Sequence, residues 1–145
     1  MQSDVFNHQI EPLPYAPTIY QAAHVNSRQV IYITARDRRT RLVTENWLRR
    51  MGEPDPVILY AEGIYTTKGD LAFAAGVTLM VEDTLAEAHV VGNRLGPKRS
   101  LLLDLPWNKE DPGVIAKPYQ RLTVEEIVEV MQKSEEGKAW RGLLP

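Results

Sequence analysis

The chain contains no cysteine among its 145 residues. This absence excludes a disulfide framework, a zinc site built on thiolates and a cysteine nucleophile. The chain also lacks a continuous apolar stretch of the roughly 18 residues that a membrane span requires. Its first residues have neither the basic start nor the long apolar centre of a signal peptide. We therefore expect a soluble, cytoplasmic protein without a membrane partner.

Neither sign of charge is in large excess, since 17 basic residues face 19 acidic ones and the net charge is −2. No global basic field attracts nucleic acid, and we do not expect nucleic acid as a partner. The densest basic patch is Arg36, Arg38, Arg39 and Arg41. Without interleaved aromatic residues such a patch is typical of a solvated helix start, although it also offers phosphate contacts.

Strand-like and helix-like segments alternate along the chain. Short apolar runs predict strands at residues 30–34, 57–60, 77–81 and 101–103. Amphipathic spacing predicts helices at 40–51, 67–75 and 85–95, after a short helix near 19–24. Strands separated by helices of about ten residues imply right-handed crossovers and a parallel sheet covered on both faces. The pattern predicts an α/β fold with a doubly wound, Rossmann-like parallel sheet.

The remaining segments flank this core. Residues 1–16 are rich in proline and read as an irregular entry segment or the remnant of a cap domain, followed by the α/β core at 17–108. Residues 109–145 are predicted to form a loop and a C-terminal helix, which opens at the capping box formed by Thr123 and Glu126. The three histidines fall at unrelated spacings and predict no metal site.

Three polar positions follow predicted strands or open a helix between them. Thr34 ends one strand, Glu82 and Asp83 end another, and Lys68 opens the intervening helix. Ligands of open parallel sheets bind beyond the carboxyl ends of the strands. Taken singly, Thr34 reads as a turn cap, the acidic pair as a helix N-cap with a solvated neighbour, and Lys68 as a solvated charge. Together they supply a hydroxyl, a cation and carboxylates, which a bound phosphate with magnesium needs.

With these motifs, residues 5–108 resemble the haloacid dehalogenase-like phosphohydrolases, and more narrowly their 5'(3')-deoxyribonucleotidase-like branch. The segments that carry the resemblance are Tyr32-Ile33-Thr34-Ala35-Arg36, Thr44-Glu45-Asn46-Trp47-Leu48, Lys68-Gly69-Asp70, Val81-Glu82-Asp83 and Leu105-Pro106-Trp107-Asn108.

The resemblance implies a magnesium-dependent phosphatase of the nucleotidase type. Thr34 would then bind the transferring phosphoryl group through its hydroxyl, with Ala35 and Arg36 completing the substrate contacts. Lys68 would neutralise charge on the nucleophile and the phosphate. The implied substrate is a phosphorylated small molecule such as a deoxynucleoside monophosphate, and the oligomeric state stays open, a homo-oligomer included.

The same resemblance implies that Glu82 and Asp83 hold Mg²⁺ directly or through water. Family members, however, open with a strand ending in Asp-x-Asp, which supplies the nucleophile and the general acid and base. No Asp-x-Asp occurs in this chain, and Asp104, which ends an apolar run, is followed by Leu105 and Pro106. In the family the missing strand lies between the strands predicted here at 30–34 and 77–81. Its loss would leave two sheet edges unpaired.

Three interpretations remain open for the missing nucleophile strand. The chain is a truncated reading of a longer phosphatase, or it recruits the strand from a partner or from its own rearranged N-terminus. In the third interpretation it is a catalytically silent binding or interaction module that kept the fold. Whether the chain is an enzyme is therefore undecided at this level.

Overall fold

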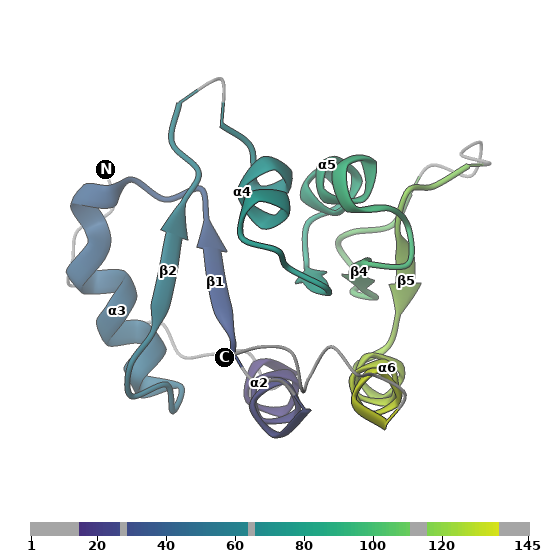
Figure 1. The fold of residues 1–145 in the computed structure, drawn as a ribbon, viewed down its shortest axis with the longest axis horizontal. Helices are drawn as coiled ribbons and strands as arrows, with labels where there is room; N and C mark the ends of the chain where they lie inside the picture. Colours follow the sequence, from purple (N-terminus) through teal and green to yellow (C-terminus); the bar gives the residue numbers. More distant parts are fainter. Residues whose placement is uncertain (1–14, 27–28, 64–65, 111–115, 137–145) are drawn as a thin grey trace. The chain divides into compact units, whose positions relative to one another are not determined.

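The computed structural model describes residues 15–26, 29–63, 66–110 and 116–136 (Figure 1). The chain forms two compact units, one made of residues 1–60 and 128–145 and the other of residues 61–127. Of the predicted entry segment, residues 1–14 lie outside the described residues, while Tyr15 and Ala16 open a helix.

The first unit has a two-stranded parallel sheet. Helix α2 (Tyr15–Asn26) precedes strand β1 (Ile31–Thr34), and a 3₁₀ turn, η1 (Arg38–Thr40), leads into helix α3 (Arg41–Arg50) and strand β2 (Val57–Tyr60). The two strands pair in parallel along their whole length, from Ile31 opposite Val57 to Thr34 opposite Tyr60. The predicted strands at 30–34 and 57–60 and the helix at 40–51 are confirmed.

Local sequence explains the boundaries of α3. The side chain of Asp37 accepts the N–H of Arg39 at 2.8 Å, which caps the turn η1 ahead of the helix. Val43 and Leu48 bury one face of α3. Gly52, at φ +110°, then takes a left-handed conformation that L-residues avoid, and the helix ends there.

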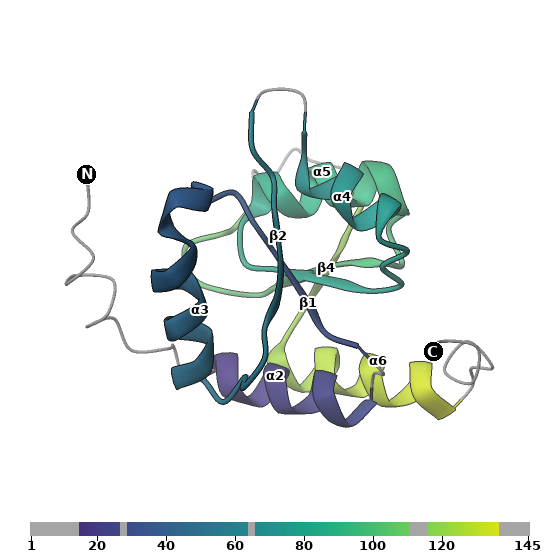
Figure 2. The same cartoon turned by 60° about the vertical axis from the view of Figure 1, so that its left-hand side comes forward.

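The second unit has a three-stranded parallel sheet in the order β3-β4-β5. Its elements are α4 (Lys68–Ala74), β3 (Met80–Glu82), α5 (Leu85–Leu95), β4 (Ser100–Leu103), β5 (Gln120–Leu122) and the first turn of α6 (Val124–Glu136). Helices α4 and α5 lie side by side in both views (Figures 1 and 2).

Strand β5 corrects the prediction for residues 109–145, which contained only a loop and a helix. Gln120, Arg121 and Leu122 make up a strand without an apolar run, so periodicity gave no signal for it. The Thr123 side chain caps α6 as predicted, but the Glu126 carboxylate contacts the Thr123 hydroxyl and not its backbone N–H, so half of the capping box is present. The Thr123 hydroxyl accepts the N–H of Glu126 at 3.2 Å and donates to the Glu126 carboxylate at 3.2 Å.

Strand β4 forms the core of the second unit. Leu101 and Leu102 are completely buried, and Leu102 packs with Ala88 and Tyr119. Ser100, equally buried, donates its hydroxyl to the Ala88 carbonyl at 2.7 Å, which ties β4 to α5. Strand β4 is the one described strand of this unit with a partner on each side.

The α/β class is therefore confirmed, with the described strands arranged as two small parallel sheets. Each pairing joins strands in the same direction, as predicted. None of the helices in the described ranges combines the length and the apolar character that a membrane crossing would need.

Gly92 lets helix α5 pack closely against the backbone of Pro118. We expect this packing to affect stability more than the helix propensity of the residue at this position. A Cβ atom at this position would lie 1.7 Å from the carbonyl oxygen of Pro118. Propensity alone favours alanine over glycine by about 1 kcal/mol, but we expect Gly92→Ala to destabilise the protein by about 1–3 kcal/mol through overpacking. Urea unfolding measures the change. The neighbouring exposed substitution Asn93→Ala is the control and should not destabilise; a Gly92→Ala protein as stable as the wild type would contradict the packing.

Candidate functional site

The predicted site residues fall into two groups, one in each unit. Thr34, Ala35 and Arg36 belong to the first unit, whereas Lys68 and the Glu82-Asp83 pair belong to the second. In the first group, the Thr34 hydroxyl accepts the N–H of Arg36 at 3.1 Å. Thr34 therefore caps the turn after β1, as its simpler interpretation expected, while Ala35 and Arg36 are exposed.

Lys68 and Glu82 form a largely buried ion pair in the second unit. The Lys68 Nζ lies 3.3 Å from Oε1 and 3.4 Å from Oε2 of Glu82. The Glu82 side chain is 6% exposed and that of Lys68 16%. Lys68 is held at the first position of α4, where the side chain of Thr67 caps the helix by accepting the N–H of Asp70 at 3.0 Å.

Burial changes the acidity of Glu82. Removal from water raises the pKa of Glu82 to about 7, because the attraction of Lys68 offsets only part of the desolvation. A carboxyl group that titrates near neutral pH at the end of a parallel strand is suited to proton transfer, although structural ion pairs have perturbed pKa values as well.

Asp83 follows β3 and lies in the turn that leads into α5. Its side chain is exposed, and its Oδ1 accepts the Thr84 hydroxyl at 3.2 Å. Its main-chain carbonyl accepts a hydrogen bond from the Asn108 side-chain amide at 2.8 Å. The N-cap of α5 is Thr84, so the interpretation of the Glu82-Asp83 pair as the N-cap is wrong.

The two residues predicted to hold Mg²⁺ have different surroundings. Mg²⁺ in proteins is commonly held by one or two carboxylates together with waters and substrate phosphate. The exposed carboxylate of Asp83 contacts Thr84, whereas the buried carboxylate of Glu82 pairs with Lys68. Within the described ranges, no cluster of three or more histidine, aspartate or glutamate side chains surrounds a common point.

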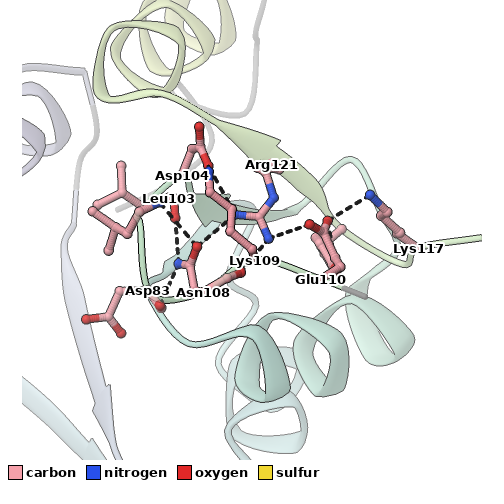
Figure 3. Close-up of polar contacts among 10 residues, drawn as sticks. Asp83, Leu103, Asp104, Asn108, Lys109, Glu110, Lys117 and Arg121 are labelled. Atoms are coloured by element: carbon pink, nitrogen blue, oxygen red, sulfur yellow. Dashed lines mark hydrogen bonds and ion pairs between the residues drawn. The ribbon is translucent and has the colours of Figure 1, made fainter. Parts of the chain in front are cut away.

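A polar network joins the carboxyl ends of β3, β4 and β5 (Figure 3). The Nδ2 of Asn108 donates to the carbonyls of Asp83 and Leu103, each at 2.8 Å. Its Oδ1 accepts from the N–H of Leu105 at 3.2 Å and from the Arg121 guanidinium at 2.7 Å. Asn108 is 5% exposed, so these four hydrogen bonds satisfy a buried amide completely.

Two carboxylates, those of Asp104 and Glu110, also bind the Arg121 guanidinium and hold it in place. Arg121 pairs with Asp104 at 3.2 Å and with Glu110 at 2.7 Å. Hydrogen bonds from Arg121 and Lys117 lower the pKa of Glu110 to about 2. Asp104 is bound by Lys109 as well, and these contacts keep the pKa of Asp104 below its ordinary value. The sequence predicted no role for Asp104, and the structure shows that it belongs to an ion-pair network.

A second polar cluster surrounds Glu53 in the first unit. Its carboxylate accepts the Tyr20 hydroxyl at 2.9 Å and the Tyr32 hydroxyl at 3.4 Å, and lies 2.8 Å from the Nε2 of His24. Burial alone would raise the pKa of Glu53, but the hydrogen bonds from Tyr20, from the Asp55 amide and from His24 hold it below the ordinary value. The cluster links α2, β1 and the segment after α3, which is a structural role.

Sequence patterns did not predict a role for Glu53 or Arg121, and Asn108 was included only as the last residue of the Leu105-Pro106-Trp107-Asn108 motif. Their partners lie far along the chain, since 33 residues separate Tyr20 from Glu53 and 13 separate Asn108 from Arg121. A spacing rule within one helix or strand cannot detect contacts of this range. The four-residue motif that ends at Asn108 was the available signal.

Comparison with known proteins identifies no relative. No model of a protein family matches the chain, and neither curated proteins nor solved structures show significant similarity to it.

The raised pKa of Glu82 predicts a pH-dependent stability. The carboxyl binds its proton at about pH 7 in the folded chain against an ordinary 4.5. Between these values the native state binds more protons than the unfolded state, so the free energy of unfolding falls as pH rises, by at most about 1.4 kcal/mol per pH unit. The fall should be missing in Glu82→Gln.

Urea unfolding of both proteins at a series of pH values from 4.5 to 7 measures this difference. Glu125→Gln, which removes an exposed carboxylate from α6, is the control and should follow the wild type. Parallel stability curves for Glu82→Gln and the wild type would show that Glu82 titrates normally.

Proposed function

We propose that the chain is a haloacid dehalogenase-like, magnesium-dependent phosphohydrolase domain of the nucleotidase type, whose nucleophile strand comes from a segment outside these 145 residues. The observation that carries the proposal is the largely buried Lys68–Glu82 pair at the carboxyl end of β3, with Asp83 directly after it. Phosphoryl transfer depends mainly on positioning and on compensation of negative charge. A half-buried ammonium beside a buried carboxylate at a strand end is suited to both.

The composition of the edge strands supports the proposal. Strand β1 has the sequence Ile-Tyr-Ile-Thr and β3 has Met-Val-Glu, whereas β5 carries glutamine and arginine. Charged residues are typical of edge strands, and apolar runs are typical of strands inside a parallel sheet. Strands β1 and β3 nevertheless have one described partner each. Strand β1 has the apolar sequence of an interior strand, although β3 carries Glu82 and the equally apolar β2 also has one described partner.

Backbone directions in β3 define where a further strand would bind. Met80 donates its N–H to the carbonyl of Arg99 in the residue before β4, at 2.8 Å. Since successive residues of a strand alternate in direction, Val81 directs its N–H and C=O away from β4. A parallel strand pairing with Val81 would extend the sheet on the side opposite β4.

The proposed complete domain is a doubly wound, Rossmann-like parallel sheet, as the resemblance implies. In it Thr34 would contact the phosphate, and Lys68 would neutralise its charge. Asp83 would hold Mg²⁺, which supplies Lewis-acid stabilisation of the phosphate oxygens when bound.

The alternative is a catalytically silent binding or interaction module with the same fold. One observation favours it: no Asp-x-Asp occurs anywhere in the chain, so the chain alone has no aspartate placed as the nucleophile. In this alternative the Lys68–Glu82 pair serves stability, and exposed sheet edges serve to bind a partner strand.

Supplying the missing strand tests the proposal. The purified chain with Mg²⁺ is assayed against p-nitrophenyl phosphate and deoxynucleoside monophosphates, with and without a synthetic apolar peptide ending in Asp-x-Asp. We expect no turnover without the peptide and turnover with it. Lys68→Met should reduce that turnover by about 100-fold or more, since it removes a charge that stabilises the transition state.

A peptide ending in Asn-x-Asn is the matched control and should bind without supporting turnover. Asp83→Asn should abolish the activity that the Asp-x-Asp peptide restores. If that peptide binds and no phosphate ester is hydrolysed, the enzyme proposal fails and the silent module remains.

A further inference from the structure

A dense group of arginines follows the end of β1 in the first unit. Residues 36–41 contain four arginines and a single aspartate. They include the turn η1 and the first residue of α3. Strands β1 and β2 end side by side, with Thr34 opposite Tyr60, and α3 begins at the same end of the sheet (Figure 1). The segment at the carboxyl end of these two strands therefore carries an excess of positive charge.

Two carboxylates contact the arginines of this segment. Asp37 is bound by Arg39, whose Nε lies 2.9 Å and whose terminal nitrogen lies 2.6 Å from Oδ2. Glu45 is shared between Arg41 at 3.6 Å and Arg49 at 3.7 Å, and both distances exceed that of a good hydrogen bond. Asp37 is thus fully engaged by one arginine, whereas Arg41 is held loosely and its side chain is 61% exposed.

Tyr60, the last residue of β2, has an unsatisfied hydroxyl group. The hydroxyl oxygen is buried and has no hydrogen-bond partner among the described residues. The guanidinium carbon of Arg38 lies 5.8 Å from the centroid of the Tyr60 ring, a distance typical of a cation–π contact. A buried polar group without a partner costs free energy, and a bound ion or water molecule is a common explanation for one. The hydroxyl is therefore a donor that still needs an acceptor.

The charges of three arginines act on the Tyr60 hydroxyl. Burial raises the pKa of Tyr60 and Glu45 raises it further, whereas Arg41, Arg38 and Arg36 act in the opposite direction. Since the pKa stays above its ordinary value, the hydroxyl keeps its proton at neutral pH and can donate a hydrogen bond. An acceptor at this position would also be attracted by the arginines, so an anion fits it best.

We infer that Arg38, Arg41 and the Tyr60 hydroxyl form a binding site for a phosphate group at the carboxyl end of β2. A phosphate monoester carries about −1.5 to −2 charges at neutral pH, and a guanidinium presents paired N–H groups to its oxygens. Rotation of the exposed Arg38 side chain admits the ligand to the hydroxyl. None of the three residues belongs to the site proposed for phosphoryl transfer, so the inference does not rest on the proposed function.

The test uses the isotope-labelled full chain, titrated with sodium phosphate at constant ionic strength and followed by two-dimensional amide NMR. We expect saturable shifts of the amide signals from Arg38 to Arg41 and at Tyr60. Arg38→Gln and Arg41→Gln should each weaken the affinity measured from these signals by about tenfold, because each removes a charge-assisted hydrogen bond. A parallel titration with a deoxynucleoside monophosphate distinguishes free phosphate from a monoester, and saturable binding of either one supports the inference.

Tyr60→Phe separates a ligand contact from a structural role. The substitution removes only the hydroxyl, which has no hydrogen-bond partner among the described residues, so it should not lower the unfolding temperature. It should weaken phosphate binding by about fivefold, the loss expected for one hydrogen bond of ordinary strength. A lower unfolding temperature with unchanged phosphate affinity would show that the hydroxyl is structural and would overturn its place in the site.

Two control variants locate the binding. Arg50→Gln removes the same charge from the opposite end of α3 and should leave the affinity unchanged. Lys68→Met removes the cation proposed for phosphoryl transfer and should also leave it unchanged. Affinity that falls in Lys68→Met but not in Arg38→Gln or Arg41→Gln would overturn the inference.

A titration with sodium chloride tests for a merely solvated arginine patch. Chloride shifts as large as those caused by phosphate at equal ionic strength would contradict a phosphate site, because simple screening does not distinguish the two anions. If the Asp-x-Asp peptide fails to support turnover while phosphate binding depends on Arg38 and Arg41, the enzyme proposal alone is refuted and the phosphate site stands.

Discussion

The fully buried strand β4 is the constraint on which the second unit depends. It pairs with β3 on one side and β5 on the other, and its leucines fill the core beneath α5. Parallel pairing brings the carboxyl ends of all three strands to one edge, so Glu82, Asp83, Asp104 and Asn108 gather there. Glu82 and Asn108 are buried there and require partners, whereas the Asp83 side chain is exposed. Lys68 pairs with Glu82, Arg121 donates to Asn108, and both Lys109 and Arg121 pair with Asp104.

The edges of the two small sheets connect this architecture to function. Strand β1 is largely apolar, and β1 and β3 have one described partner each, so each has backbone groups with which a further strand could pair. In the proposed domain, a strand that adds to β3 would also supply the nucleophile, so strand binding and activity would be coupled.

Much of the architecture could be predicted from the sequence, because its helices and apolar strands have clear periods. The strand at 57–60 was placed at its observed bounds, and α3, α4, α5 and β4 lie within a few residues of their predictions. Strand β5 was missed because Gln120 and Arg121 interrupt any apolar pattern. The sequence placed Lys68 and Glu82 in the same site but did not predict the ion pair between them. The raised pKa of Glu82 depends on burial, which a sequence does not reveal. Asn108 and Arg121 required the fold, since a loop and a strand bring them together.

Hydrogen exchange at the backbone amide of Val81, which points away from β4, tests directly whether a further strand joins β3. The exchange rate is measured in the chain alone and with a saturating apolar peptide that ends in Asp-x-Asp. We expect the peptide to slow exchange at Val81 strongly, because the added strand accepts its N–H in a new parallel pairing. An unchanged exchange rate at Val81 with the peptide present would show that no strand adds to β3.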